Sequence, residues 1–127
     1  IERLAPLNVS PPLYLDIAKS DFPPTDHIYA ANVVHIMPAA LLAPLFRGAA
    51  SAMPRGGKLC FYGPFKYLGE FTADSNATFD EWLKARNPLS GIRDIETLQA
   101  SAQSRGFSLM SDTPMPANNQ LLVFTKQ

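Results

Sequence analysis

Two polar side chains follow an apolar stretch and could do chemistry where a β-strand ends. Asn32 and His35 lie at the end of the segment 27–35, whose apolar residues predict a strand buried on both faces. Open α/β sheets bind ligands at the carboxyl ends of their strands. Histidine titrates near neutral pH, so His35 could act as a base or orient a substrate, and Asn32 could hydrogen-bond a substrate or a cofactor. The alternative is that both side chains are structural.

A second group of candidate residues closes the next predicted strand, 58–62. Tyr62 ends this strand, and Gly63 would let the backbone approach a ligand closely because glycine has no side chain. Phe65 could line a binding pocket. The other interpretation is a tight turn with buried aromatic rings.

Arg93 and Asn118 each allow more than one interpretation. Arg93 could bind an anionic group through both arms of its guanidinium, it could pair with Asp80 or Asp94, or it could simply be solvated; we favour the ion pair. Asn118 could face a substrate, but asparagine also favours turns because its side chain satisfies the local backbone.

The remaining motifs exclude several kinds of site. His27 and His35 have no adjacent set of cysteines or carboxylates, so we predict no metal site. None of the 7 glycines forms a Gly-x-Gly loop between a strand and a helix, which nucleotide-binding folds require. Cys60 is the one cysteine; it cannot form an intramolecular disulfide, and we expect an inert core residue in a cytoplasmic protein.

The composition fits one soluble globular domain over residues 1–127, of which 46% are hydrophobic. Its 11 basic and 11 acidic residues cancel, which gives no electrostatic footprint for nucleic acid or an anionic membrane. No apolar run is long enough to span a bilayer. Zero net charge provides little repulsion between copies, so self-association is compatible with this sequence.

Hydrophobic spacing and turn residues predict the elements that position these candidates. We expect strands over 13–17, 27–35, 58–62, 107–112 and 121–125. We expect helices over about 41–49, over 76–86 with Ser75 as its cap, and from Asp94 to Gly106, with Pro44 distorting the first. Alternation in the first part predicts parallel strands in an α/β fold, and the short connection before the last strand predicts an antiparallel pair.

Several strings in this order resemble one family. They are Ala31-Asn32-Val33-Val34-His35-Ile36, Leu45-Phe46-Arg47-Gly48-Ala49, Tyr62-Gly63-Pro64-Phe65, Ser75-Asn76 with Phe79-Asp80, Gly91-Ile92-Arg93-Asp94, and Met115-Pro116-Ala117-Asn118-Asn119. The chain is similar to the methyltransferase-like 26 family, also called domain-of-unknown-function family 938. The similarity runs from about Leu4 to the end of the chain.

The resemblance implies a Rossmann-like class I methyltransferase fold that binds S-adenosylmethionine and methylates a small-molecule or protein acceptor of unknown identity. This chain would be its N-terminally truncated C-terminal part, a partial sheet that lacks the first two strands and the glycine-rich cofactor loop. Asp16 would then contact the cofactor's adenine, Asn32 would contact the cofactor, and Phe65 would line the acceptor pocket. The family's sheet order places the strand 27–35 beside 58–62, which is followed by the strand 121–125 and then by 107–112.

Two functions follow from these expectations. The first is an S-adenosylmethionine-dependent methyltransferase, inactive as this chain because the cofactor loop is missing. The alternative is a non-catalytic dimerising or binding module derived from that fold. The strand at 27–34 would be an exposed apolar edge, so we expect a homodimer through it.

Overall fold

The computed structural model describes residues 7–19 and 21–127, and most of its strands form one four-stranded sheet. The sheet contains β1 (Ile28–Ala31), β2 (Lys58–Gly63), β5 (Phe107–Met115) and β6 (Asn119–Lys126). Two short strands, β3 (Lys66–Tyr67) and β4 (Glu70–Phe71), form a separate hairpin. The helices are α1 (Leu42–Ala52), α2 (Asp74–Arg86) and α3 (Ile95–Gln103), with 3-10 turns η2 (Ala39–Leu41) and η3 (Pro116–Asn118).

The sheet order is β1-β2-β6-β5, which confirms the expected α/β sheet and its antiparallel finish. β1 runs parallel to β2, with Ala30 opposite Phe61. β6 is antiparallel to both β2 and β5, with Leu122 opposite Phe61. Parallel β1 and β2 end at the same edge of the sheet, so the residues that follow them are brought together.

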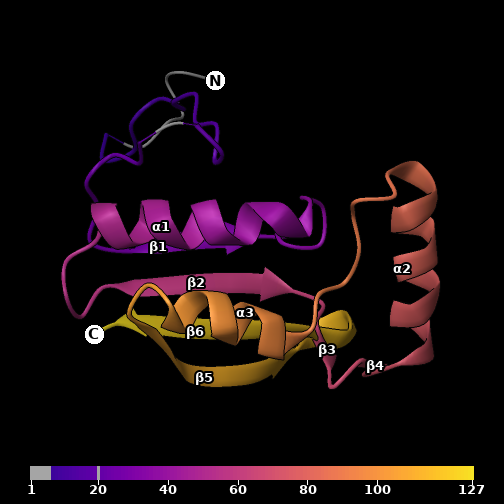
Figure 1. Cartoon of the computed structure of the whole chain (residues 1–127). Helices are drawn as coiled ribbons and strands as arrows, with labels where there is room; N and C mark the ends of the chain where they lie inside the picture. The colour runs from indigo at the N-terminus through magenta and orange to yellow at the C-terminus, as the bar shows by residue number, and fades with distance from the viewer. Residues whose placement is uncertain (1–6, 20) are drawn as a thin grey trace.

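The hydrophobic core lies between the sheet and the two helices α1 and α3, which pack on the same face (Figure 1). The ring of Phe46, on α1, is 0% exposed and has its centroid within 6.0 Å of three other ring centroids. Those rings belong to Phe61, Phe107 and Phe124, one from each of three strands. α1 thus fixes the strands whose ends carry the candidate residues.

Pro44 does not distort α1, contrary to our expectation. The chain enters the helix through η2, and α1 begins at Leu42, so Pro44 lies in its first turn. Backbone N–H groups in the first turn have no intrahelical partner, so a residue without an N–H costs nothing there.

The starts of the other two helices confirm one predicted cap and correct another. Asp94 is the N-cap residue of α3, as predicted, although its carboxylate accepts a hydrogen bond from the Gly69 N–H rather than capping the helix. α2 begins at Asp74 with Ala73 as N-cap, so Ser75 lies inside the helix and is not its cap.

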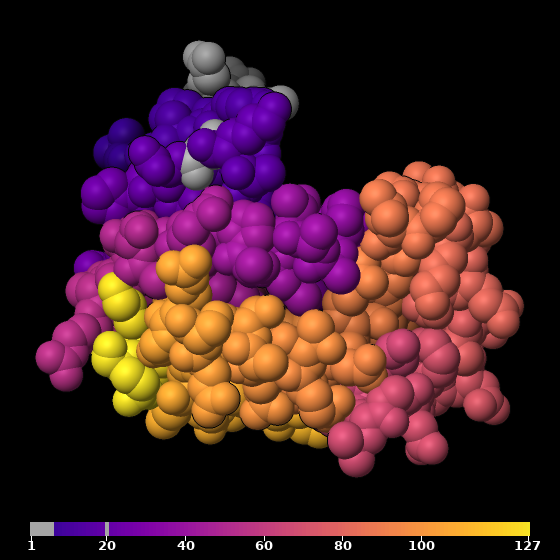
Figure 2. Space-filling model, viewed as in Figure 1, coloured from indigo at the N-terminus to yellow at the C-terminus, as the bar shows by residue number. Residues whose placement is uncertain are grey.

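The first predicted strand, 13–17, is wrong. Residues 7–26 contain no strand where they are described, and most of them lie above α1 in the view of Figures 1 and 2. Leu13 and Tyr14 are exposed there, whereas Phe22 packs so closely on α1 that a Cβ on Gly48 would lie 2.5 Å from its ring. A short apolar run does not make a strand without a neighbouring strand to pair with.

The second predicted strand, 27–35, is shorter than expected. β1 ends at Ala31, and Asn32 then adopts a left-handed backbone conformation with φ of 56°. Residues 34–36 form a turn. His35 is therefore placed by a turn beyond the strand, which lets it face a cavity rather than the sheet.

The second face of the sheet has no helix on it within residues 7–19 and 21–127. Side chains that alternate with the core residues point to this face, and they are half-buried at Cys60, Tyr62, Leu121 and Val123. Tyr29, on edge strand β1, is 64% exposed. Cys60 is therefore half-buried on this face and does not belong to the core, where we had placed it.

Candidate functional site

A cavity of about 430 Å³ opens where β1 and β2 end. Its walls come from the residues after these strands, the first turns of α2 and the turn between β5 and β6. The lining residues are Asn32, His35, Pro64, Ser75, Asn76, Phe79, Ala117, Asn118 and Asn119. Its volume is in the range of small-molecule sites, and its place at the carboxyl ends of parallel strands is where α/β folds bind ligands.

Asn32 turns the chain away from the sheet and toward the cavity. Its backbone N–H donates to the carbonyl of Tyr62, 2.8 Å away, which continues the pairing of β1 with β2 by one residue. Its φ of 56° lies in the region that asparagine tolerates better than most residues. The residue type thus explains how the chain leaves the strand in time to place His35 at the cavity wall.

His35 is 4% exposed, yet within the described ranges no hydrogen bond engages either ring nitrogen. The edge of its ring meets Phe79 on α2, with 5.7 Å between ring centroids. Its backbone carbonyl accepts a hydrogen bond from the Gly91 N–H at 2.9 Å. A Cβ on Gly63 would lie 3.2 Å from the Nδ1 atom of His35, so this position requires a glycine or a displaced ring.

Burial and the nearby Arg93 guanidinium both lower the pKa of His35 below its ordinary value of 6.5. Each disfavours the imidazolium, one by removing water and the other by charge repulsion. The ring is therefore neutral at neutral pH and keeps a lone pair with which to accept a proton.

We expect the His35 ring to titrate with a midpoint below pH 6.5. The chemical shifts of its carbon-bound protons in NMR spectra, recorded as a function of pH, measure this midpoint. Because folding favours the neutral ring, this group's contribution to stability is complete above pH 6.5. It is lost as the pH falls below that value. A midpoint at or above 6.5 would contradict the buried, cation-flanked environment described above.

Asparagine side chains tie α2 to the β5–β6 turn and so close the cavity on one side. The Asn76 amide donates to the carbonyl of Asn118 at 3.2 Å, and the Asn118 amide donates to the hydroxyl of Ser75 at 3.2 Å. Asn119 donates to the Tyr62 hydroxyl at 3.3 Å. Ala117 and Asn118 have φ of 62° and 59°, so the turn presents its residues in left-handed conformations.

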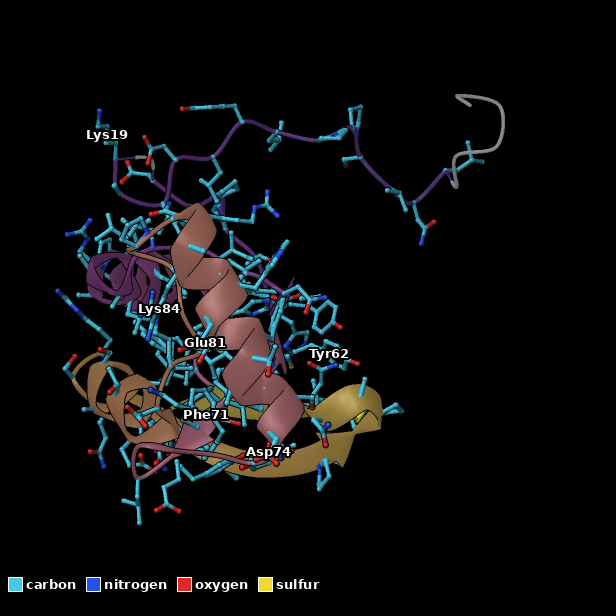
Figure 3. The ribbon with its side chains drawn as sticks, turned by 90° about the vertical axis from the view of Figure 1, so that its right-hand side faces the viewer. Lys19, Tyr62, Phe71, Asp74, Glu81 and Lys84 are labelled. Carbon is cyan, nitrogen blue, oxygen red and sulfur yellow. The ribbon has the colours of Figure 1, made fainter. Side chains whose placement is uncertain are left out.

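The opposite flank of α2 is held by a buried carboxylate. Asp80 accepts a hydrogen bond from the Ile92 N–H at 2.8 Å and pairs with Lys84 at 2.9 Å. Burial alone would raise the pKa of Asp80, but these interactions outweigh it and hold the pKa below its usual value. Figure 3 shows Lys84 and Tyr62 on opposite sides of α2, so this anchor leaves the cavity side of the helix open.

Arg93 forms no ion pair within residues 7–19 and 21–127, so the pairing that we favoured is absent there. Its guanidinium instead donates to the backbone carbonyls of Met37 and Leu89. This cross-link joins the turn after His35 to the loop after α2. Arg93 is therefore occupied in holding the cavity walls and does not line the cavity.

The structure brings together three of the residues singled out in the sequence. Asn32, His35 and Asn118 line the cavity, and Tyr62 is linked to its rim through Asn119. Phe65 does not line it; the ring is 1% exposed and lies in the core. Gly63 lies behind the His35 ring.

Asp16 lies outside the cavity, in the segment over α1, where its carboxylate accepts a hydrogen bond from the Ala18 N–H at 3.0 Å. Our sequence reasoning missed Ser75, Asn76 and Phe79 as cavity residues. A signal was available in the sequence: these polar and aromatic residues belong to one helix, and Phe79 follows Ser75 and Asn76 by four and three residues, so their side chains lie on neighbouring parts of its surface.

The cavity does not fit S-adenosylmethionine as a whole. A ribose needs a carboxylate for its hydroxyls, and the cofactor's amino-acid end needs backbone N–H groups of a glycine-rich loop. No carboxylate lines the cavity, and glycine is absent from its lining. The described residues instead form a small pocket with amide, hydroxyl and imidazole groups. The described ranges contain no group of three or more histidine, cysteine or carboxylate side chains that could hold a metal.

The fold resembles several solved structures, methyltransferases among them. An O-methyltransferase family 2 protein from Planctomyces limnophilus DSM 3776, in complex with apigenin, matches 88% of this chain with 21% identity and a TM-score of 0.78. Human N-acetylserotonin methyltransferase, in complex with S-adenosylmethionine, matches 90% with 16% identity and a TM-score of 0.74. LepI C52A, in complex with S-adenosylhomocysteine and a substrate analogue, matches 99% with 12% identity and a TM-score of 0.77.

The chain spans about a third of the length of these proteins, 33% in each case. At such identities the likeness shows the fold: an α/β sheet that matches part of the methyltransferase fold.

Among the described residues, no helix is both long and apolar enough to cross a membrane. A family model described as "Protein of unknown function (DUF938)" matches residues 1–126, and the chain belongs to this family.

Proposed function

We propose that this chain provides the acceptor-binding part of an S-adenosylmethionine-dependent methyltransferase and that its cavity holds the acceptor. The observation that carries the proposal is the buried, neutral His35, whose ring nitrogens have no hydrogen-bond partner among the described residues. It lines a polar cavity at the carboxyl ends of parallel strands. Because no described residue hydrogen-bonds the ring of His35, a ligand hydroxyl in this cavity would find a free hydrogen-bond acceptor there.

In this function His35 is the base for the acceptor. The acceptor's O–H or N–H group donates to one ring nitrogen, and the proton moves to that nitrogen as the oxygen or nitrogen becomes nucleophilic. Asn32 and Asn119 offer amide groups that orient the acceptor. No residue of this chain is assigned to the methyl donor, because the cavity lacks the groups that the cofactor needs.

Membership of the methyltransferase-like 26 family is part of this proposal. The motifs around Asn32, Tyr62 and Asn118 support membership of the methyltransferase-like 26 family, with its acceptor a small molecule or a protein. The single cysteine supports a cytoplasmic location.

Calorimetric titration with apigenin tests the acceptor site, because a methyltransferase of similar fold was crystallised with this hydroxylated aromatic compound. We expect saturable binding that His35→Phe weakens about tenfold, through loss of one buried hydrogen bond to the phenol. His27→Phe is the matched control, since His27 lies before the opposite end of β1. Equal affinities of the two variants, with both folded by circular dichroism, would contradict the role of His35.

A second candidate function, self-association, rests on the edge of the sheet at β1. Edge strand β1 has backbone groups that no strand of the described chain pairs on its outer side, and Tyr29 is 64% exposed on it. Unpaired edges recruit other strands, and the zero net charge does not oppose contact between copies. We propose a homodimer that pairs two β1 edges.

Light scattering during size-exclusion chromatography measures this association. We expect the mass of a dimer for the wild type, and the 13.9 kDa of one chain for Tyr29→Glu, which places a charge at the edge. Tyr14→Glu serves as the control, on a tyrosine that is 89% exposed and belongs to no strand. A wild type that stays monomeric at millimolar concentration argues against the dimer.

A further inference from the structure

Three aromatic groups and one cation continue from the cavity along α2. The ring of His35 meets Phe79, and Phe79 stacks on Trp82 with 5.8 Å between centroids and 18° between planes. The guanidinium carbon of Arg86 lies 4.6 Å from the centroid of the Trp82 ring. We call His35, Phe79, Trp82 and Arg86 the α2 ladder.

A second cavity, of about 260 Å³, lies at the far end of this ladder. Its lining residues are Ile36, Trp82, Leu83, Arg86, Asn87 and Ser90. The two cavities have neighbouring residues on the sheet side, His35 in the first and Ile36 in the second. On the helix side their residues follow one another along α2.

Helical spacing places both cavities on the same flank of α2. Ser75, Phe79, Trp82 and Arg86 are separated by three or four residues, so their side chains form one stripe along the helix. The first two line the first cavity and the last two line the second. Because they follow one another along the same flank of α2, the two cavities can form one groove between α2 and the turn that carries His35.

The groove is polar and uncharged at one end and carries a cation at the other. Arg86 is the one charged residue among those that line either cavity. No carboxylate pairs with it among the residues that the structure describes, whereas Lys84, two residues earlier, pairs with Asp80 on the opposite flank. Trp82 is 51% exposed beside it, so the part of its ring that Phe79 and Arg86 do not cover is open to a ligand.

We propose that this groove binds an elongated aromatic acid, with its hydroxyl at His35 and its carboxylate at Arg86. The proposal deepens the acceptor function above and rests on it. Stacked rings suit a flat aromatic ligand, and a guanidinium binds a carboxylate through two parallel hydrogen bonds. The step from Phe79 to Arg86 rises about 10 Å along the helix, which matches the length of two linked phenyl rings.

The test is an NMR titration with 4′-hydroxybiphenyl-4-carboxylate and with its neutral carboxamide. Trp82 is the one tryptophan of the chain, so a single indole N–H signal reports on the far end of the groove. The His35 ring signals report on the near end. We expect the acid to shift both sets of signals and to bind about tenfold more tightly than the amide, because only the acid is charged.

Arg86→Gln should abolish this preference by weakening the binding of the acid about tenfold relative to the amide. Arg105→Gln, an exposed arginine just after α3, is the control and should keep the preference. If both compounds shift His35 alone and bind equally, the acid class is wrong while the acceptor function stands. If neither compound shifts the His35 ring, the acceptor function fails and the ligand class fails with it.

Discussion

Replacing Phe46 with alanine is expected to lower the free energy of unfolding by about 4 kcal/mol. The Phe46 ring is fully buried, and its three aromatic neighbours come from three different strands. They are held by a β-sheet, so they cannot collapse into the space that the ring leaves. Urea unfolding followed by circular dichroism measures the loss.

Phe71→Ala is the matched control for this variant. The Phe71 ring is half-buried in the small β3–β4 hairpin, beside the ammonium group of Lys66 at 5.3 Å from its centroid. We expect less than half the loss that Phe46→Ala causes, because partly exposed rings contribute less buried area. Equal losses for the two variants would mean that α1 is not the element that organises the sheet.

Gly63→Val is expected to abolish binding of apigenin and to cost about 2 kcal/mol of stability. A single Cβ on this residue would already lie 3.2 Å from the Nδ1 atom of His35 and 3.9 Å from the Oδ1 atom of Asn32. Valine adds two methyl groups to that atom, so the His35 ring must move into the cavity that the acceptor occupies. Calorimetry measures the binding, and urea unfolding measures the stability.

Gly69→Val provides the comparison for a glycine substitution at a turn. Nothing lies within 4 Å of a Cβ on Gly69, and its φ of 79° makes the substitution strained for the backbone alone. This variant should lose stability but keep its affinity for apigenin. Retained binding in Gly63→Val would show that the His35 ring is not fixed against the end of β2.

The sheet and its helices could be predicted because their signals are local. Buried strands show as apolar runs between turn residues, and α1 and α3 show apolar residues at helical spacing. The order β1-β2-β6-β5 followed from the family resemblance. The run 13–17 failed because a short apolar segment looks the same in a strand and in an extended segment that packs over a helix.

The candidate site was predicted only in part because its walls come from segments far apart in the chain. His35 and Asn32 were recognisable as polar residues after a strand. Phe79 was not, because its contact with His35 depends on where α2 lies after the loop that follows β2. Arg93 was assigned to carboxylates by charge, but backbone carbonyls became its partners once the loop after α2 closed on it.

The most direct test of the acceptor site is the nitrogen NMR spectrum of the His35 ring as apigenin is added. We predict a neutral ring before addition, and a shift of one ring nitrogen at saturation as its lone pair accepts the phenol's hydrogen bond. The backbone signals of Asn32 and Asn118 should shift with the same midpoint, because both residues line the cavity. Saturation of the chain by apigenin with both His35 nitrogens unchanged would show that the acceptor binds elsewhere.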